Sequence, residues 1–203
     1  MKRIYFSILS FFLFSTTLLF GTEYTIETVP NVHLQNAKAF VSNPDAILSP
    51  SAEQQINLLL DSLQTKTSAE VAVVAVNSIG DADIKHFATA LFEHWGIGKR
   101  EKDNGLLILF VLDQRKITFE TGYGLEGILP DAICKRIQTR YMLPEFKTEN
   151  YDKGMLQGLN AIYHRLSTPE AQDELWVQSQ TAQEDWGKVL QYYAITSLLF
   201  SII

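Results

Sequence analysis

Two short apolar runs constrain the fold of this chain more than any other feature of its sequence. Residues 70–76 read EVAVVAV, and residues 106–112 read LLILFVL. Runs of this length, rich in β-branched and large aliphatic residues, are typical of strands that are buried on both faces of a sheet. A sheet that is buried on both faces needs helices on both sides, so the sequence predicts an α/β fold.

Helical patterns flank these runs. Ser49 and Pro50 suit the cap and the first position of a helix, which continues with an apolar repeat at Ile56, Leu59, Leu60 and Leu63. Beyond Gly80, Asp81 and Asp83 can each cap a second helix. The apolar stripe of that second helix comprises Ile84, Phe87, Ala88, Leu91, Phe92 and Trp95.

The second half of the chain adds one strand and two helices. Residues 116–121 alternate between polar and apolar, which predicts a half-exposed strand paired as a hairpin with residues 106–112. A helix is expected from about Pro130 to Tyr141 and is expected to end before Pro144, and another is expected from about Asn150. The predicted fold is therefore a mixed β-sheet sandwiched by α-helices.

The two ends differ from the middle. Lys2 and Arg3 precede an uncharged apolar stretch, so residues 1–22 are predicted to be a signal peptide or, if uncleaved, a signal anchor. The folded domain is expected over residues 23–168 and a polar linker over 169–186. Residues 187–203 are predicted to be the start of a transmembrane helix, although they are shorter than the about 20 apolar residues that span a bilayer. The alternative is an apolar C-terminal helix docked on the domain.

The charge of the chain limits its partners. The 17 Lys and Arg residues and 23 Asp and Glu residues give a formal charge of -6. This balance argues against a nucleic-acid-binding protein, which needs a basic surface to displace counterions. A single cysteine, Cys134, allows no internal disulfide and is expected to be a small packing residue.

A G-x-G-x-x-G pattern occurs at residues 122–127, after a predicted strand. A dinucleotide site needs the third glycine inside a helix and an acidic residue about 20 positions later. Here Pro130 places the helix after the motif, so no nucleotide cofactor is expected. The glycines are expected to shape a sharp loop with positive φ angles.

An ordered series of motifs resembles the TPM domain family, named after plant thylakoid, photosystem-associated and nematode receptor-modulating members. The resemblance covers about residues 38–166 and lies in segments 41–49, 70–76, 91–98, 103–107, 120–131, 144–146 and 150–154. It implies an extracytoplasmic α/β domain flanked by a signal sequence and a transmembrane helix. Family members often have a glycine-rich tail beyond the membrane segment, which is not found within residues 1–203, and Ala69 occurs where glycine is frequent.

Four polar residues are candidates for a cation site. Asp103 and Asn104 precede one hairpin strand, whereas Glu126 and Asp131 follow the other, so the hairpin places both loops at one edge of the sheet. Carboxylate and amide oxygens suit Ca²⁺ or Mg²⁺ rather than zinc. The alternatives are structural: Asp131 can cap its helix, and Asp103 and Asn104 can turn the chain.

A short basic loop lies beside the predicted cation site. Lys99, Arg100 and Lys102 are either a solvated turn or a contact for phosphate or a partner. The four histidines lack a metal-binding pair at helical spacing.

The resemblance implies an accessory, assembly or quality-control role for membrane proteins or complexes. The alternative is a metal-dependent phosphatase acting on phosphomonoesters, because phosphatase activity is attributed to plant members of the family.

Overall fold

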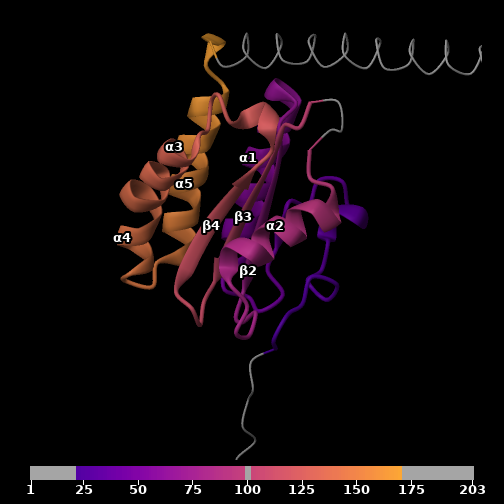
Figure 1. The fold of residues 1–203 in the computed structure, drawn as a ribbon. Helices are drawn as coiled ribbons and strands as arrows, with labels where there is room; N and C mark the ends of the chain where they lie inside the picture. The colour runs from indigo at the N-terminus through magenta and orange to yellow at the C-terminus, as the bar shows by residue number, and fades with distance from the viewer. Residues whose placement is uncertain (1–21, 99–101, 171–203) are drawn as a thin grey trace, which may run out of the picture.

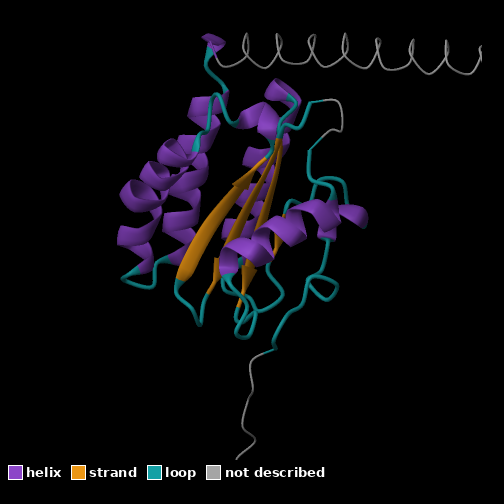
Figure 2. Ribbon diagram, in the orientation of Figure 1, coloured by secondary structure: helices purple, strands orange, loops and turns teal. Residues whose placement is uncertain are grey.

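A computed structural model describes residues 22–98 and 102–170 and shows a four-stranded mixed sheet with helices on both faces (Figures 1 and 2). The strands follow the order β1-β2-β3-β4 across the sheet. They comprise β1 (Val41–Ser42), β2 (Glu70–Val76), β3 (Gly105–Val111) and β4 (Lys116–Thr121). The α/β prediction and the three longer strands are confirmed.

The register of the strands fixes the two edges of the sheet. β1, β2 and β3 are parallel, and β2 pairs with β3 from Glu70–Gly105 to Val76–Val111. β4 runs antiparallel to β3, from Leu106–Thr121 to Val111–Lys116, which confirms the predicted hairpin. The start of β3 and the end of β4 therefore lie at the same edge, called here the amino edge. The opposite edge, where β2 and β3 end, is the carboxyl edge.

The helices divide unequally between the two faces. One face is covered by α1 (Pro50–Thr67), α3 (Asp131–Ile137), α4 (Leu143–Phe146) and α5 (Tyr151–Leu166), and the other by α2 (Ile84–Trp95) (Figure 1). Two separate apolar clusters result because successive strand residues point to opposite faces. Val73 and Ala75 of β2 face the four-helix side, whereas Val74 and Val76 face α2.

Both predicted helix starts are confirmed. The Ser49 hydroxyl accepts a hydrogen bond from the Ala52 amide at 3.2 Å, and Pro50 begins α1. The Asp83 carboxylate accepts from the amides of Lys85 and His86, each at 3.0 Å, and thereby caps α2. Capping of this kind satisfies amide groups that have no partner within the helix.

Two features of the fold differ from the sequence prediction. β1 was not predicted, because two residues are too few to show a periodic pattern. The expected helix end before Pro144 is wrong: a π-helical turn (Gln138–Met142) follows α3, and Pro144 lies in the first turn of α4. Proline is tolerated there because the amides of a first helical turn have no intrahelical partner.

The predicted terminal segments lie outside the described residues. The signal segment 1–22 overlaps them only at Thr22, and both the linker from residue 171 onward and residues 187–203 fall beyond them. Within residues 22–98 and 102–170, no helix is both long enough and apolar enough to cross a membrane.

Backbone segments cross at the amino edge with almost no space between them. A Cβ atom at Gly124 would lie 1.9 Å from the Lys102 carbonyl oxygen, and one at Gly122 would lie 2.1 Å from the Asp103 carbonyl oxygen. Hydrogen bonds join the same segments, from the Gly124 amide to Asp103 O at 3.0 Å and from the Gly122 amide to Gly105 O at 2.8 Å. We call these contacts the glycine crossing.

The glycine crossing corrects one expectation about the G-x-G-x-x-G segment. None of its three glycines has a positive φ angle, and Gly122 has φ of -68°. Gly122 and Gly124 are needed for the close approach of two backbones rather than for a left-handed conformation.

Replacing Gly124 by alanine should destabilise the protein, because the new methyl group would meet rigid backbone rather than a flexible side chain. We expect Gly124→Ala to lower the free energy of unfolding by about 1–3 kcal/mol, measured by urea titration. Gly127, in the same loop, is exposed and has no positive φ, so Gly127→Ala is the matched control. Equal stability of the two variants would contradict the steric role of Gly124.

Candidate functional site: the amino edge of the sheet

The structure brings together the two loops that carry the predicted cation ligands. Asp103 lies two residues before the first residue of β3, and Glu126 directly follows the short helical turn Tyr123–Leu125 after β4. The hydrogen bond between the Gly124 amide and Asp103 O joins the two loops directly. The chain folds this way locally because the antiparallel register of β3 and β4 places their outer ends side by side.

The acidic side chains of these loops are exposed to solvent. Asp103, Glu126 and Asp131 are each exposed, and Asp103 has a positive φ of 44°. Within residues 22–98 and 102–170, no group of three or more His, Cys, Asp and Glu side chains is arranged to hold a metal ion. The structure therefore places the acids at one edge but leaves their role as ligands a prediction.

Asn104 has a structural role that the sequence did not reveal. Its side chain is only 1% exposed, and its amide nitrogen donates to the Ser68 carbonyl oxygen at 2.8 Å and to the Ser68 hydroxyl at 3.2 Å. Ser68 ends α1 in a left-handed conformation with φ of 62°. Asn104 thus fastens the end of α1 to the start of β3, and its backbone carbonyl accepts from the Glu70 amide at 3.0 Å.

Asp131 occupies the first turn of α3 without acting as its cap residue. Pro130 is the cap position and provides no side-chain hydrogen bond. A carboxylate in the first turn is favoured by the partial positive charge at a helix N-terminus. The alternative expectation that Asp131 caps its helix is therefore wrong, although its charge suits the first turn that it occupies.

The basic loop is described only in part. Lys102 extends toward the end of α1, where its amino group donates to the Ser68 hydroxyl at 3.4 Å. Lys99 and Arg100 lie outside the described residues. Lys102 and Asn104 thus share Ser68 as a partner.

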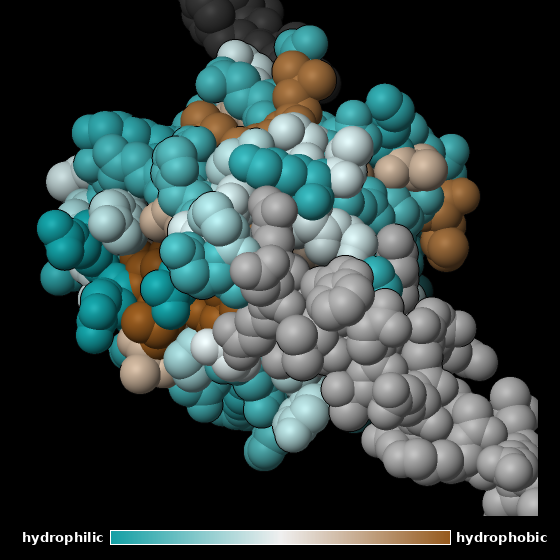
Figure 3. All heavy atoms as spheres, turned by 90° about the horizontal axis from the view of Figure 1, so that it is seen from above, coloured by the Kyte–Doolittle hydropathy of each residue, from teal (hydrophilic) through white to brown (hydrophobic). Residues whose placement is uncertain are grey.

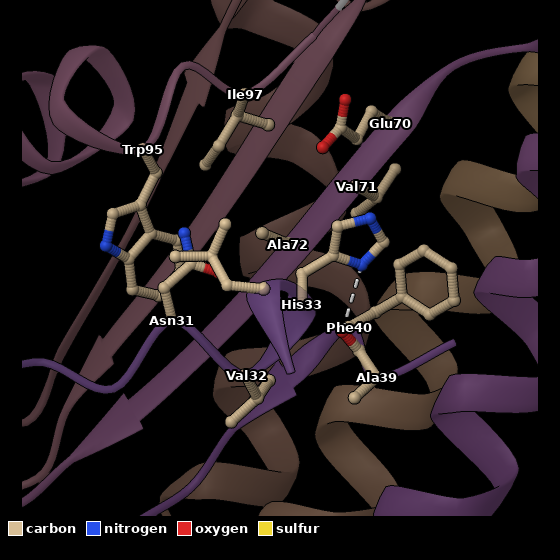
Figure 4. Close-up of a pocket in the computed structure, with 11 residues that line it drawn as sticks. Asn31, Val32, His33, Ala39, Phe40, Glu70, Val71, Ala72, Trp95 and Ile97 are labelled. Carbon is tan, nitrogen blue, oxygen red and sulfur yellow. Dashed lines mark hydrogen bonds between the residues drawn. The ribbon is translucent and has the colours of Figure 1, made fainter. Parts of the chain in front are cut away.

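A small cavity opens beside the amino edge, between β2, the segment 31–40 and the end of α2 (Figure 4). Its volume is about 70 Å³, and its lining is mostly apolar, with His33, Glu70 and Trp95 at its margin. The Glu70 carboxylate accepts from the Gly98 amide at 3.1 Å, and His33 Nδ1 lies 3.2 Å from the Ala39 carbonyl oxygen. These contacts join segments of the cavity wall, and the Glu70 amide donates to the carbonyl oxygen of Asn104 just before β3.

Asp45 lies at the opposite, carboxyl edge. Its two carboxylate oxygens accept from the Asn77 amide at 2.7 Å and from the Tyr24 hydroxyl at 3.2 Å. Burial first, and then the negative charge of Asp45, raise the pKa of Tyr24 above its usual value. Asp45 is thus a structural acceptor away from the predicted cation ligands.

The view onto the amino edge shows a surface that is largely hydrophilic where described residues are visible (Figure 3). Hydrophobic residues form separate spots on it rather than one continuous area. Tyr123, at the tip of the glycine crossing, is an exposed large hydrophobic residue with 78% of its surface accessible.

Comparisons with known proteins agree with this architecture. A solution structure of the N-terminal domain of a protein from P. gingivalis is 41% identical with a TM-score of 0.67, covering 71% of this chain and 92% of that one. A protein from Bizionia argentinensis is 18% identical with a TM-score of 0.54, covering 62% of this chain and 86% of that one. The N-terminal domain of a protein from Corynebacterium glutamicum is 15% identical with a TM-score of 0.52, covering 70% of this chain and 86% of that one. The last two show similarity of fold alone.

Curated protein sequences provide no match to the chain. The family model described as the TPM domain matches residues 41–165, which is more than half of the 203 residues. These residues include all four strands, both loops of the amino edge and the helices α1 to α4, with nearly all of α5. The chain therefore belongs to the TPM domain family.

Proposed function

We propose that this protein is an extracytoplasmic, membrane-tethered TPM domain that binds a divalent cation at its amino edge. In this proposal it serves as an accessory, assembly or quality-control module for membrane proteins or complexes. The observation that carries the proposal is the direct contact between the loops of Asp103 and Glu126, each of which presents an exposed carboxylate.

Divalent cation binding would use the chemistry that the two loops already offer. Ca²⁺ and Mg²⁺ prefer carboxylate, amide and carbonyl oxygens. Asp103, Glu126 and Asp131 would supply carboxylates, and Asn104 is proposed as a ligand through its amide oxygen. The glycine crossing would hold the two loops in place, so binding would not have to order them first.

Cation binding to the folded state must raise its stability. For the full chain, we expect Ca²⁺ or Mg²⁺ to raise the melting temperature relative to EDTA, by about 2.7 kcal/mol of stability at a hundredfold excess over the dissociation constant. The measurement is thermal unfolding followed by circular dichroism in EDTA, Ca²⁺ and Mg²⁺ in turn.

Substitutions of the proposed ligands test where the cation binds. Glu126→Gln and Asp131→Asn should each reduce the cation-dependent rise, because each removes a carboxylate from the proposed ligand set. Glu93→Gln is the matched control, since Glu93 is exposed on α2 outside the two loops. Identical melting in EDTA and in both cations would contradict the proposal.

Membrane tethering rests on the sequence of the two ends. A basic residue pair before an apolar stretch at 1–22, and an uncharged run at 189–203, support export and anchoring. A tether would raise the effective concentration of the domain near membrane partners, so modest contacts would suffice. Lys99, Arg100 and Lys102 are the proposed contacts for such a partner or for a phosphate group.

Fractionation of cells that express the full chain tests the tether. We expect the protein in the membrane pellet after an alkaline carbonate wash, with the folded domain open to added protease only from the extracytoplasmic side. Recovery in the soluble fraction, or protection of the domain from external protease, would exclude the proposed topology. A cytoplasmic enzyme carried through the same wash controls for trapped contents.

The described residues offer no specific observation that favours the alternative, a metal-dependent phosphatase. The single cysteine of the chain is a poor nucleophile. Cys134 is buried, and its Sγ donates a hydrogen bond to the Leu129 carbonyl oxygen at 3.3 Å. Burial and then the negative charge of Asp131 raise the pKa of Cys134 to about 11. The expectation that Cys134 packs in the core agrees with its place in the four-helix cluster.

The Cys134 thiol should therefore be unreactive in the folded protein. At pH 8 we expect Ellman's reagent to label Cys134 quickly in urea but only slowly in buffer. In the folded protein the thiol is mostly protonated, and burial keeps the reagent away from it. Above pH 9 stability should fall as pH rises toward 11, since the unfolded thiol loses its proton first. Rapid labelling of the folded chain at pH 8 would overturn this assignment.

A further inference from the structure

Two adjoining cavities lie at the carboxyl edge of the sheet, away from the predicted cation site. The first, of about 360 Å³, is bounded by the end of β3, the β3–β4 turn and the segment that joins α4 to α5. The second, of about 330 Å³, continues past the start of α5 toward Ala46 and shares Glu149 and Tyr151 with the first. We call the first cavity the carboxyl-edge cleft. In open α/β sheets, ligands bind beyond the carboxyl ends of the strands.

Three aromatic rings form the apolar wall of the carboxyl-edge cleft. The ring of Phe110, at the end of β3, lies 4.7 Å from that of Phe146 and 5.2 Å from that of Tyr151. Phe146 and Tyr151 meet edge to face at 5.6 Å. Phe110 is buried, whereas Phe146 and Tyr151 are only partly buried, so two of the three rings retain a surface that a ligand can cover.

Two cationic side chains line the same cleft. Arg115, in the β3–β4 turn, and Lys147, after α4, are exposed, and neither forms an ion pair with any described residue. Lys153 beside them is paired with Glu145 at 2.8 Å and is not available in the same way. Glu149 is the one acid of the cleft lining, which leaves an excess of one positive charge.

The amide groups at the start of α5 add to this positive character. Asn150 precedes the helix without a side-chain cap hydrogen bond, and Tyr151 is its first residue. The N-terminus of a helix favours negative charge because its amides are unpaired and its dipole is positive there.

Backbone strain is concentrated around the two cavities. Among described residues, five that are not glycine have positive φ, and three of them line these cavities: Ala46 at 53°, Arg115 at 50° and Glu149 at 61°. Such conformations cost of order 1–3 kcal/mol each and cluster at functional sites. In this fold the strained residues hold the rim of the cavities, and Arg115 is itself one of them.

We propose that the carboxyl-edge cleft binds a small aromatic anion, either an aryl carboxylate or an aryl phosphate. The aromatic body packs on Phe146 and Tyr151, and the anionic group lies between the guanidinium of Arg115 and the amino group of Lys147. A cavity of this size matches the lower range of small-molecule sites, which are largely apolar with a few converging polar groups. The carboxyl-edge cleft is separate from the proposed cation site, because the seven residues of β3 place the two edges about 20 Å apart.

The test is a titration of the ¹⁵N-labelled full chain, in EDTA, with three naphthalene probes followed by amide chemical shifts. We expect 2-naphthoate or 2-naphthyl phosphate, or both, to shift amides of residues 112–116 and 146–153. The neutral 2-naphthylmethanol should bind about tenfold or more weakly, because it lacks the charge that Arg115 and Lys147 recognise. Comparison of the two anions shows which group the cleft prefers.

Variants assign the binding to the cleft. Arg115→Asn removes the charge and retains a residue that tolerates a left-handed backbone, and Lys147→Gln removes the second charge. Each should weaken anion binding about threefold to tenfold, whereas Arg136→Gln and Lys135→Gln, on the exposed side of α3, should leave it unchanged. Arg115→Lys should retain most of the affinity, and unchanged melting temperatures confirm that the variants are folded.

Three results would overturn the proposal. These are the absence of binding by either anion, equal affinity for the anions and the neutral alcohol, and shifts confined to residues outside the carboxyl-edge cleft. Because all titrations contain EDTA, failure of the cation proposal does not affect the outcome.

Discussion

The burial of β3 on both faces is the constraint on which the rest of the structure depends. All seven of its residues are buried, so its two faces must be covered by different elements. α2 covers one face, and the longer helices α1 and α5 cover the other. Each of these helices must end near an edge of the sheet, and the connections between helices and strands are therefore gathered at the two edges where the candidate sites lie.

Local patterns predicted those parts of the fold that are determined by local physics. Hydrophobic periodicity and capping residues predict β2, β3, β4, α1 and α2 close to their observed bounds. β1 exists only because its two residues pair with Val73 and Val74, and no pattern within such a short segment can show this. The π-helical turn before Pro144 also depends on tertiary packing, since α5 has Gly154 and Gly158 where Phe146 and Met142 approach.

The candidate site was predictable in its topology but not in its contacts. The hairpin alone placed the loops of Asp103 and Glu126 together, because antiparallel pairing requires it. The role of Asn104 depends on Ser68, which is 36 positions away in the sequence, so no spacing within one loop could reveal it. The sequence predicts a loop at residues 122–127 but not the reason for its glycines, since Gly122 and Gly124 are required by a neighbouring backbone and not by positive φ angles.

The two edges of the sheet differ in how they are held. At the amino edge, the backbone of Lys102 and Asp103 meets that of Gly122 and Gly124, so these positions have little room, and the exposed carboxylates of Asp103 and Glu126 lie next to them. At the carboxyl edge, the cavities are bounded by long side chains and by strained backbone at Arg115 and Glu149. A rigid frame suits the near-ideal octahedral geometry that Mg²⁺ requires, whereas adaptable side chains suit an organic molecule. Because the fully buried strand β3 lies between the two proposed sites, substitutions at one edge should leave ligand binding at the other edge unchanged.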